Sequence, residues 1–116
     1  MTIAEVVARL EHAERPVALA LHKDEHFKVL TIGFKKGMLL EPHTSKFPAK
    51  IVVLEGKLVF KTAQSSQSLE KYYEMAIPVM ELHWFEAQED TICLLFQAWD
   101  ESIVHTPAHN ILGWDY

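Results

Sequence analysis

Two histidines stand in extended, mostly apolar stretches of the chain, where an imidazole could bind a metal ion or transfer a proton. His43 lies in GMLLEPHTSKFPAKIVVLEG (residues 37–56), and His83 lies in YEMAIPVMELHWFEA. Alternation along a strand would place Glu41 on the same face as His43, and Glu81 on the same face as His83. Either carboxylate could supply a further metal ligand or orient an imidazole through a hydrogen bond.

The other residues with possible chemistry are placed less favourably. His105 and His109 have the i, i+4 spacing of a zinc-binding pair on a helix, but Pro107 between them argues against a regular helix. Cys93 is the only cysteine, so it cannot form an internal disulfide, and no base accompanies it in TICLLF. We expect Cys93 to be a small buried apolar residue in a protein of a reducing compartment.

Short strand-like segments would have to position these side chains. Eight apolar segments follow one another from residue 17 onward: 17–22, 26–34, 37–43, 49–56, 57–63, 69–77, 79–87 and 90–99. Short strands at such close spacing predict an all-β sandwich or barrel. The glycines in residues 35–37 and 55–57 predict hairpin turns, and the polar residues 64–67 predict a loop.

One short amphipathic helix is expected before the strands, within residues 1–15. Thr2 and Glu5 have the spacing of a capping box. Four apolar residues then recur with helical spacing and would form one stripe: Ile3, Val6, Val7 and Leu10. Pro16 disfavours helix at the residue before it and should end the segment.

Length and composition predict one cytoplasmic domain. The chain has 116 residues, 49% of them hydrophobic, and a formal charge of -5 without a basic stripe, so nucleic acid is not an expected partner. No apolar run approaches the roughly 20 residues of a membrane span, and acids at the N-terminus argue against a secretion signal. We divide the chain into the helix (1–15), the barrel (16–98) and an extension (99–116), whose apolar content predicts packing on the barrel or on a partner subunit.

The stretch around the first histidine resembles the first motif of the cupin superfamily. That motif runs glycine, five residues, His-x-His, three or four residues, glutamate, six residues, glycine. Gly37, His43 and Gly56 match it. The second histidine of the motif falls on Ser45, and the glutamate falls on Ala49.

The stretch around the second histidine resembles the second cupin motif. That motif runs glycine, five residues, Pro-x-Gly, two residues, histidine, three residues, asparagine. Pro78 and His83 have the matching spacing. Tyr72 and Met80 stand where the motif has glycines, and Ala87 stands where it has asparagine.

The resemblance covers about residues 17–97 and implies both a fold and a site. The cupin fold is a jelly roll of two facing sheets (the double-stranded β-helix), often dimeric. It implies here an all-β cupin-type barrel with one short N-terminal helix. Cupin metals usually have three histidine ligands and a carboxylate. Only His43 and His83 stand at matching positions, so the resemblance implies a degenerate site that holds at most a weakly bound divalent metal.

From these residues we expect a protein that binds a small organic molecule in the barrel cavity, rather than an enzyme. Six residues are expected to line the ligand site: His43, His83, Ser45, Met75, Phe60 and Phe85. One alternative is a metal-dependent oxygenase or isomerase in which Glu41 or Glu81 supplies a missing ligand. Another is an oligomer-forming scaffold. A homodimer is expected because sheet edges and the apolar helix and tail need cover.

Overall fold

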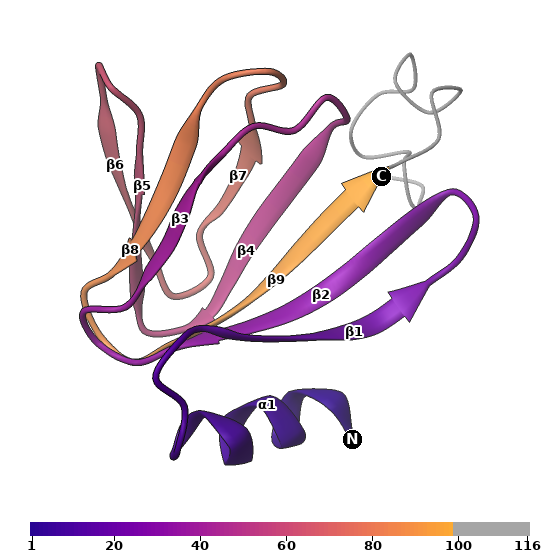
Figure 1. Cartoon of the computed structure of the whole chain (residues 1–116), viewed down its shortest axis with the longest axis vertical. Coiled ribbons are helices and arrows are strands. Elements are labelled where there is room, and N and C mark those ends of the chain that lie inside the picture. The colour runs from indigo at the N-terminus through magenta and orange to yellow at the C-terminus, as the bar shows by residue number, and fades with distance from the viewer. Residues whose placement is uncertain (99–116) are drawn as a thin grey trace.

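The computed structural model describes residues 1–98, and the expectations for residues 99–116, including His105 and His109, lie outside the described residues. Within residues 1–98, one helix precedes nine strands (Figure 1): α1 (Thr2–Leu10), β1 (Val17–Lys23), β2 (Phe27–Phe34), β3 (Leu39–His43), β4 (Ala49–Glu55), β5 (Lys57–Lys61), β6 (Ser66–Glu70), β7 (Glu74–Ile77), β8 (His83–Ala87) and β9 (Thr91–Ala98). Among these residues, no helix has the length and hydrophobicity that a membrane span requires.

The strands form two antiparallel sheets that face each other. One sheet has the order β1-β2-β9-β4-β7, and the other has the order β3-β8-β5-β6. Figure 1 shows the two sheets as opposed layers, with α1 against β1 and β2 of the five-stranded sheet. This arrangement confirms the expected jelly-roll architecture with one short N-terminal helix.

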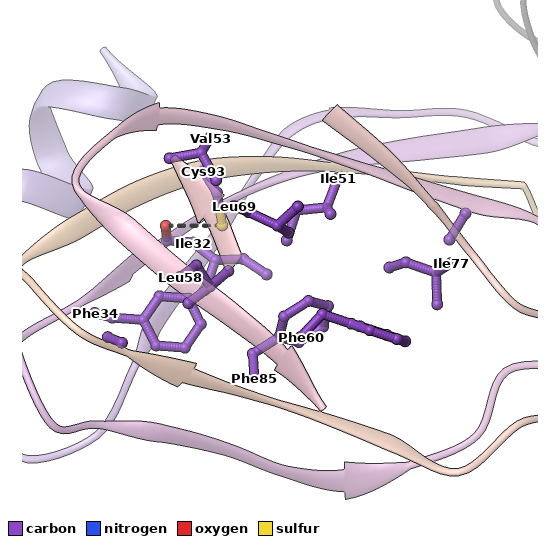
Figure 2. Packing of buried hydrophobic residues seen from close by; sticks show 12 residues of the cluster. Ile32, Phe34, Ile51, Val53, Leu58, Phe60, Leu69, Ile77, Phe85 and Cys93 are labelled. Atoms are coloured by element: carbon purple, nitrogen blue, oxygen red, sulfur yellow. Dashed lines mark hydrogen bonds between the residues drawn. The ribbon is translucent and has the colours of Figure 1, made fainter. Parts of the chain in front are cut away.

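The hydrophobic core fills the space between the sheets, and Figure 2 shows its side chains. Alternate residues of the strands point into this core, because successive side chains of a strand point to opposite faces of its sheet. Cys93 is among them, fully buried, with its thiol donating to the Ile32 carbonyl oxygen at 3.6 Å. Burial raises the pKa of Cys93 to about 12. Its expected role as a buried apolar residue is confirmed.

The two predicted glycine turns exist, but neither closes a hairpin. Gly37 and Gly56 have φ of +90° and +87°, values that glycine adopts without the strain of a Cβ. Gly37 connects β2 to β3 and Gly56 connects β4 to β5, and in each case the two strands belong to different sheets. The hairpin prediction was wrong because a turn residue indicates a local φ but not the partner of the next strand.

The prediction of a loop at residues 64–67 was wrong at its second half. Ser66 and Gln67 begin β6, an edge strand in which only Leu69 is buried. The segment predicted as a strand at 69–77 is the end of β6 and the whole of β7, which lie in different sheets. A strand exposed on nearly every residue has no apolar alternation, so its sequence looks like a loop.

The N-terminus of α1 differs from the predicted capping box. Met1 is the N-cap residue, and no side chain caps the helix. Thr2 is already helical, while Glu5 pairs with Arg9 one turn later at 2.6 Å. The glutamate therefore supports the helix through an i, i+4 ion pair rather than through the first amides.

Helix α1 packs on the five-stranded sheet at Gly33, a residue of β2 that has no side chain. Val6 and Leu10 are buried, whereas Ile3 and Val7 are 37% and 49% exposed, so only half of the predicted stripe faces the sheet. A Cβ at Gly33 would lie 2.8 Å from the Val6 side chain. The glycine thus allows the helix to approach the sheet closely.

Two residues without glycine's freedom also have positive φ. Tyr72 and Met80 have φ of 73° and 64°, and both are largely exposed. They occupy the two positions at which the second cupin motif has glycine. Both positions therefore have a left-handed conformation although neither is a glycine.

Replacing Met80 by glycine should stabilise the domain slightly. The change removes a left-handed non-glycine residue, which is strained by about 1 kcal/mol or more. It adds unfolded-state entropy that offsets part of this gain, so we expect a net rise of about 0.5 kcal/mol in the free energy of unfolding measured in urea. Leu82→Gly is the control: it changes an exposed residue of the same loop that lacks positive φ and should be destabilising. Equal losses in both variants would contradict the strain argument.

Candidate functional site

The candidate site lies at one end of the barrel, where two loops meet. One loop (residues 44–48) joins β3 to β4, and the other (residues 78–82) joins β7 to β8. Figure 1 shows both loops at the same end of the molecule. The amide of Met80 donates to the Ser45 carbonyl oxygen at 2.7 Å, which ties the two loops together.

The structure brings the two predicted histidines together at this end. His43, the last residue of β3, is paired in register with His83, the first residue of β8. Their ring centroids are 4.4 Å apart, with the planes at 61°. His83 is only 1% exposed and stacks on Phe60, with its centroid 5.4 Å away, whereas His43 remains exposed.

Each imidazole is fixed by a main-chain carbonyl. Nδ1 of His43 lies 2.9 Å from the Glu41 carbonyl oxygen, and Nδ1 of His83 lies 2.8 Å from the Glu81 carbonyl oxygen. A carbonyl oxygen can only accept, so Nδ1 must carry the hydrogen in both rings. In its neutral form each ring then presents Nε2 as an acceptor, and within residues 1–98 neither Nε2 has a hydrogen-bond partner.

The environment keeps His83 neutral near physiological pH. Burial lowers the pKa of His83, and the nearby charge of His43 lowers it further. The hydrogen bond to the Glu81 carbonyl and the charge of the Glu81 carboxylate act in the opposite direction. Because burial is the largest of these effects, the pKa of His83 lies below its ordinary value.

Glu41 and Glu81 contact the imidazoles through their main chain, not through carboxylates. The β3–β8 register shifts between Leu40 and His43, and Glu81 precedes β8. Simple strand alternation therefore does not apply to either glutamate. Within residues 1–98, no three histidine, cysteine, aspartate or glutamate residues are grouped so that they could hold a metal ion.

The two imidazoles line a small pocket with a cavity of about 20 Å³. A cavity of this size holds about one water molecule. Its lining is mostly apolar: Ile32, Phe34, Leu40, His43, Ser45, Ala49, Ile51, Ile77, His83, Phe85, Leu95 and Gln97.

Four of the six residues predicted for the ligand site line this pocket: His43, His83, Ser45 and Phe85. Phe60 lies against the His83 ring instead, and Met75 packs at the border of the core.

Gln97 is the polar pocket residue that the sequence analysis missed. Its Nε2 donates to Ser45 Oγ at 3.3 Å. The signal for it was present in β9, because alternation from buried Cys93 through Leu95 places Gln97 on the same inner face.

The tautomers of the two histidines can be measured directly. We expect ring ¹⁵N shifts at pH 8 to show the Nδ1–H form for both His43 and His83, because each Nδ1 faces a carbonyl oxygen. His12, exposed just after α1, is the control and should exchange between both tautomers in water. An Nε2–H form at either pocket histidine would contradict the assignment of Nε2 as an acceptor.

No family model matches the sequence, and no curated protein matches it. Solved structures do match. An RmlC-like cupin protein from Desulfovibrio desulfuricans is 27% identical, with a TM-score of 0.68 over 73% of this chain and 83% of that one. A cupin superfamily protein from Desulfitobacterium hafniense DCB-2 has a TM-score of 0.71 at 13% identity, over 77% and 82% of the two chains. An RmlC-like cupin with a double-stranded β-helix fold from Methanocaldococcus jannaschii has a TM-score of 0.66 at 14% identity, over 75% and 83%.

These similarities, together with the two facing sheets, show that the chain has the jelly-roll fold of small RmlC-like cupin domains. The fold implied by the spacing around His43 and His83 is confirmed.

Proposed function

We propose that this domain binds a small organic molecule at the pocket lined by His43 and His83, without a full set of metal ligands. The observation that carries the proposal is that both imidazoles line one pocket while each Nδ1 is bonded to a carbonyl oxygen, which leaves both Nε2 atoms as acceptors. Two acceptors close together in a mostly apolar lining form a typical ligand site, since a few polar groups fix orientation while apolar surface supplies affinity.

The residues that replace the cupin ligands support binding rather than metal catalysis. Ser45 and Ala49 both line the pocket at the positions where the motif has a histidine and a glutamate. Alanine offers no ligand atom, and the serine hydroxyl already donates to the Phe47 carbonyl. The polar groups left in the pocket are suited to hydrogen bonding.

A ligand-observed NMR screen tests this proposal. A fragment library is screened by saturation transfer against the wild-type protein and against the His43→Gln/His83→Gln double variant. We expect compounds whose signals depend on the two histidines, and His12→Gln should give the wild-type pattern. A library in which no compound distinguishes the double variant from wild type would contradict the proposal.

A metal-dependent enzyme is a second candidate, favoured by one specific observation. Histidines that ligate metals typically donate their other ring nitrogen to a carbonyl or carboxylate, as His43 and His83 do here. Glu41, Glu81 or the Gln97 amide oxygen would have to complete the ligand set.

Elemental analysis separates the two candidates. Stoichiometric iron, zinc, manganese or nickel in protein purified without chelator, lost in the double variant while the fold is kept, would favour the enzyme. Its absence from folded wild-type protein that still binds fragments would favour the binding function.

We also propose that the domain forms a homodimer in the cytoplasm. In the part of the chain that the structure describes, the edge strands are β1 and β7 of one sheet and β3 and β6 of the other, and main-chain groups at such edges need protection. A mass of one chain by light scattering would contradict the dimer and the scaffold alternative together.

A further inference from the structure

Three exposed apolar side chains stand beside the pocket, in the loop of residues 78–82. Val79, Met80 and Leu82 are 46%, 66% and 54% exposed, and we call them the apolar rim. The loop runs from Ile77 to His83, and both of these residues line the pocket. Exposed apolar residues gathered in one loop are unlike scattered surface ones, because they can offer apolar contacts to a ligand together.

The cavity is large enough for only one part of an organic ligand. About 20 Å³ accommodates a group the size of a water molecule, not the carbon skeleton of an organic compound. The head group of a ligand can therefore lie against the two imidazoles, while its body must remain at the entrance of the cavity. The apolar rim belongs to the loop that ends at His83, so it is the exposed apolar surface next to this site along the chain.

The polar atoms of the pocket define the head group. Nε2 of His43 and Nε2 of His83 are acceptors in the neutral rings, because each Nδ1 donates to a carbonyl oxygen. A head group that bonds to either nitrogen must donate an O–H or N–H hydrogen: a hydroxyl can donate to one of the two, and an ammonium can donate to both. Glu81, exposed between two rim residues, adds negative charge at the entrance and disfavours an anion.

We propose that the pocket takes a small amphipathic molecule, with a hydroxyl or ammonium head group against His43 and His83 and a short apolar body on the apolar rim. This inference rests on the proposed binding function and adds the chemical class of the ligand. The shared chemistry of the two head groups is a hydrogen-bond donor of the size of water.

A matched series of small molecules tests the head group and the body separately. Pentan-1-ol and pentylammonium carry a donor, methyl butyl ether has the atoms of pentan-1-ol without a donor, and methanol has the donor without the body. Each is titrated at millimolar concentration while the ring ¹⁵N signals of His43 and His83 are followed. We expect pentan-1-ol or pentylammonium to bind at least tenfold more tightly than both the ether and methanol, and the tighter of the two identifies the donor.

Variants of the rim test where the body lies. The Val79→Ser/Leu82→Ser double variant should weaken pentan-1-ol or pentylammonium at least threefold and leave methanol unchanged. Leu21→Ser is the matched control, because Leu21 is 45% exposed but lies on β1, away from the loop that joins Ile77 to His83. All these residues are exposed, so the fold should be kept.

The outcomes separate this inference from the proposed function. Equal binding of the ether and pentan-1-ol would overturn the donor head group, and unchanged affinity in the rim variant would overturn the placement of the body. If library fragments depend on the two histidines while none of the four probes moves the ring signals, the ligand class is wrong and the binding function stands. If no fragment depends on the histidines, the proposed function itself fails.

Discussion

Gly56→Ala should lower the free energy of unfolding by about 3 kcal/mol or more, a loss seen only when a mutation breaks a specific structural requirement. Gly56 connects the two sheets with φ of +87°, and a Cβ there would lie 2.2 Å from the Asp90 carbonyl oxygen and 2.8 Å from the Thr91 Cα. Two main-chain neighbours cannot move aside like the end of a side chain. The turn must therefore open, and with it the hydrogen bonds between Thr91 Oγ1 and both main-chain groups of Lys57.

Gly37→Ala separates the steric conflict from the backbone strain. Gly37 has nearly the same φ, +90°, but a Cβ there would meet nothing within 4 Å. Only the left-handed strain remains, so we expect a loss of about 1–2 kcal/mol. Urea titrations of both variants measure the difference. Equal losses would show that conformation alone, and not the contact with Asp90, makes glycine necessary at residue 56.

The pairing of the two histidines could be predicted because motif spacing encodes strand register. The spacing of His43 after Gly37, and of His83 after Pro78, matched the cupin motifs, and the structure places the two rings 4.4 Å apart. In the sequence, Tyr72 and Met80 looked like losses of the two glycines of the second cupin motif. Their positive φ shows that the surrounding chain imposes the turn conformation even where glycine is absent.

The composition of the rest of the site could not be predicted from strand alternation. Glu41 and Glu81 lie beside an irregular register and before a strand, where the period of two fails, so their carbonyls rather than their carboxylates meet the rings. Alternation along β9 places Gln97 on the inner face, but a prediction that this part of the face lines the pocket also needs the pairing of β9 with β4, which is a long-range fact. The size of the cavity depends on side-chain packing and has no counterpart in a local pattern.

Local sequence also failed to predict where α1 and the polar strand β6 begin. Thr2 and Glu5 satisfy a capping pattern, yet the helix begins one residue earlier than the pattern requires. Ser66 and Gln67 have no strand signal of their own, and pairing with β5 makes them part of the sheet. Local propensity is weak there, and the neighbouring strand or the packing of the helix determines the outcome.

The stability of the domain should fall as the pH decreases below about 6.5, and His83 should cause part of this fall. Burial lowers the pKa of His83 in the folded protein below the ordinary value of 6.5 that applies in the unfolded chain. Between these two pKa values the unfolded state binds a proton that the folded state does not, so acidification favours unfolding. The stability is fully present above pH 6.5 and is lost as the pH falls toward the folded pKa, with a limiting slope of about 1.4 kcal/mol per pH unit for one proton.

Urea unfolding between pH 7.5 and 5.5 measures this contribution before most carboxylates titrate. His83→Gln removes the titrating group while keeping an amide that can donate to the Glu81 carbonyl, so its unfolding free energy should fall less steeply over this range than that of the wild type. His12→Gln changes an exposed histidine and should keep the wild-type slope. If the slope of His83→Gln equals that of the wild type, His83 titrates alike in both states, and the ring cannot be the desolvated acceptor that the pocket requires.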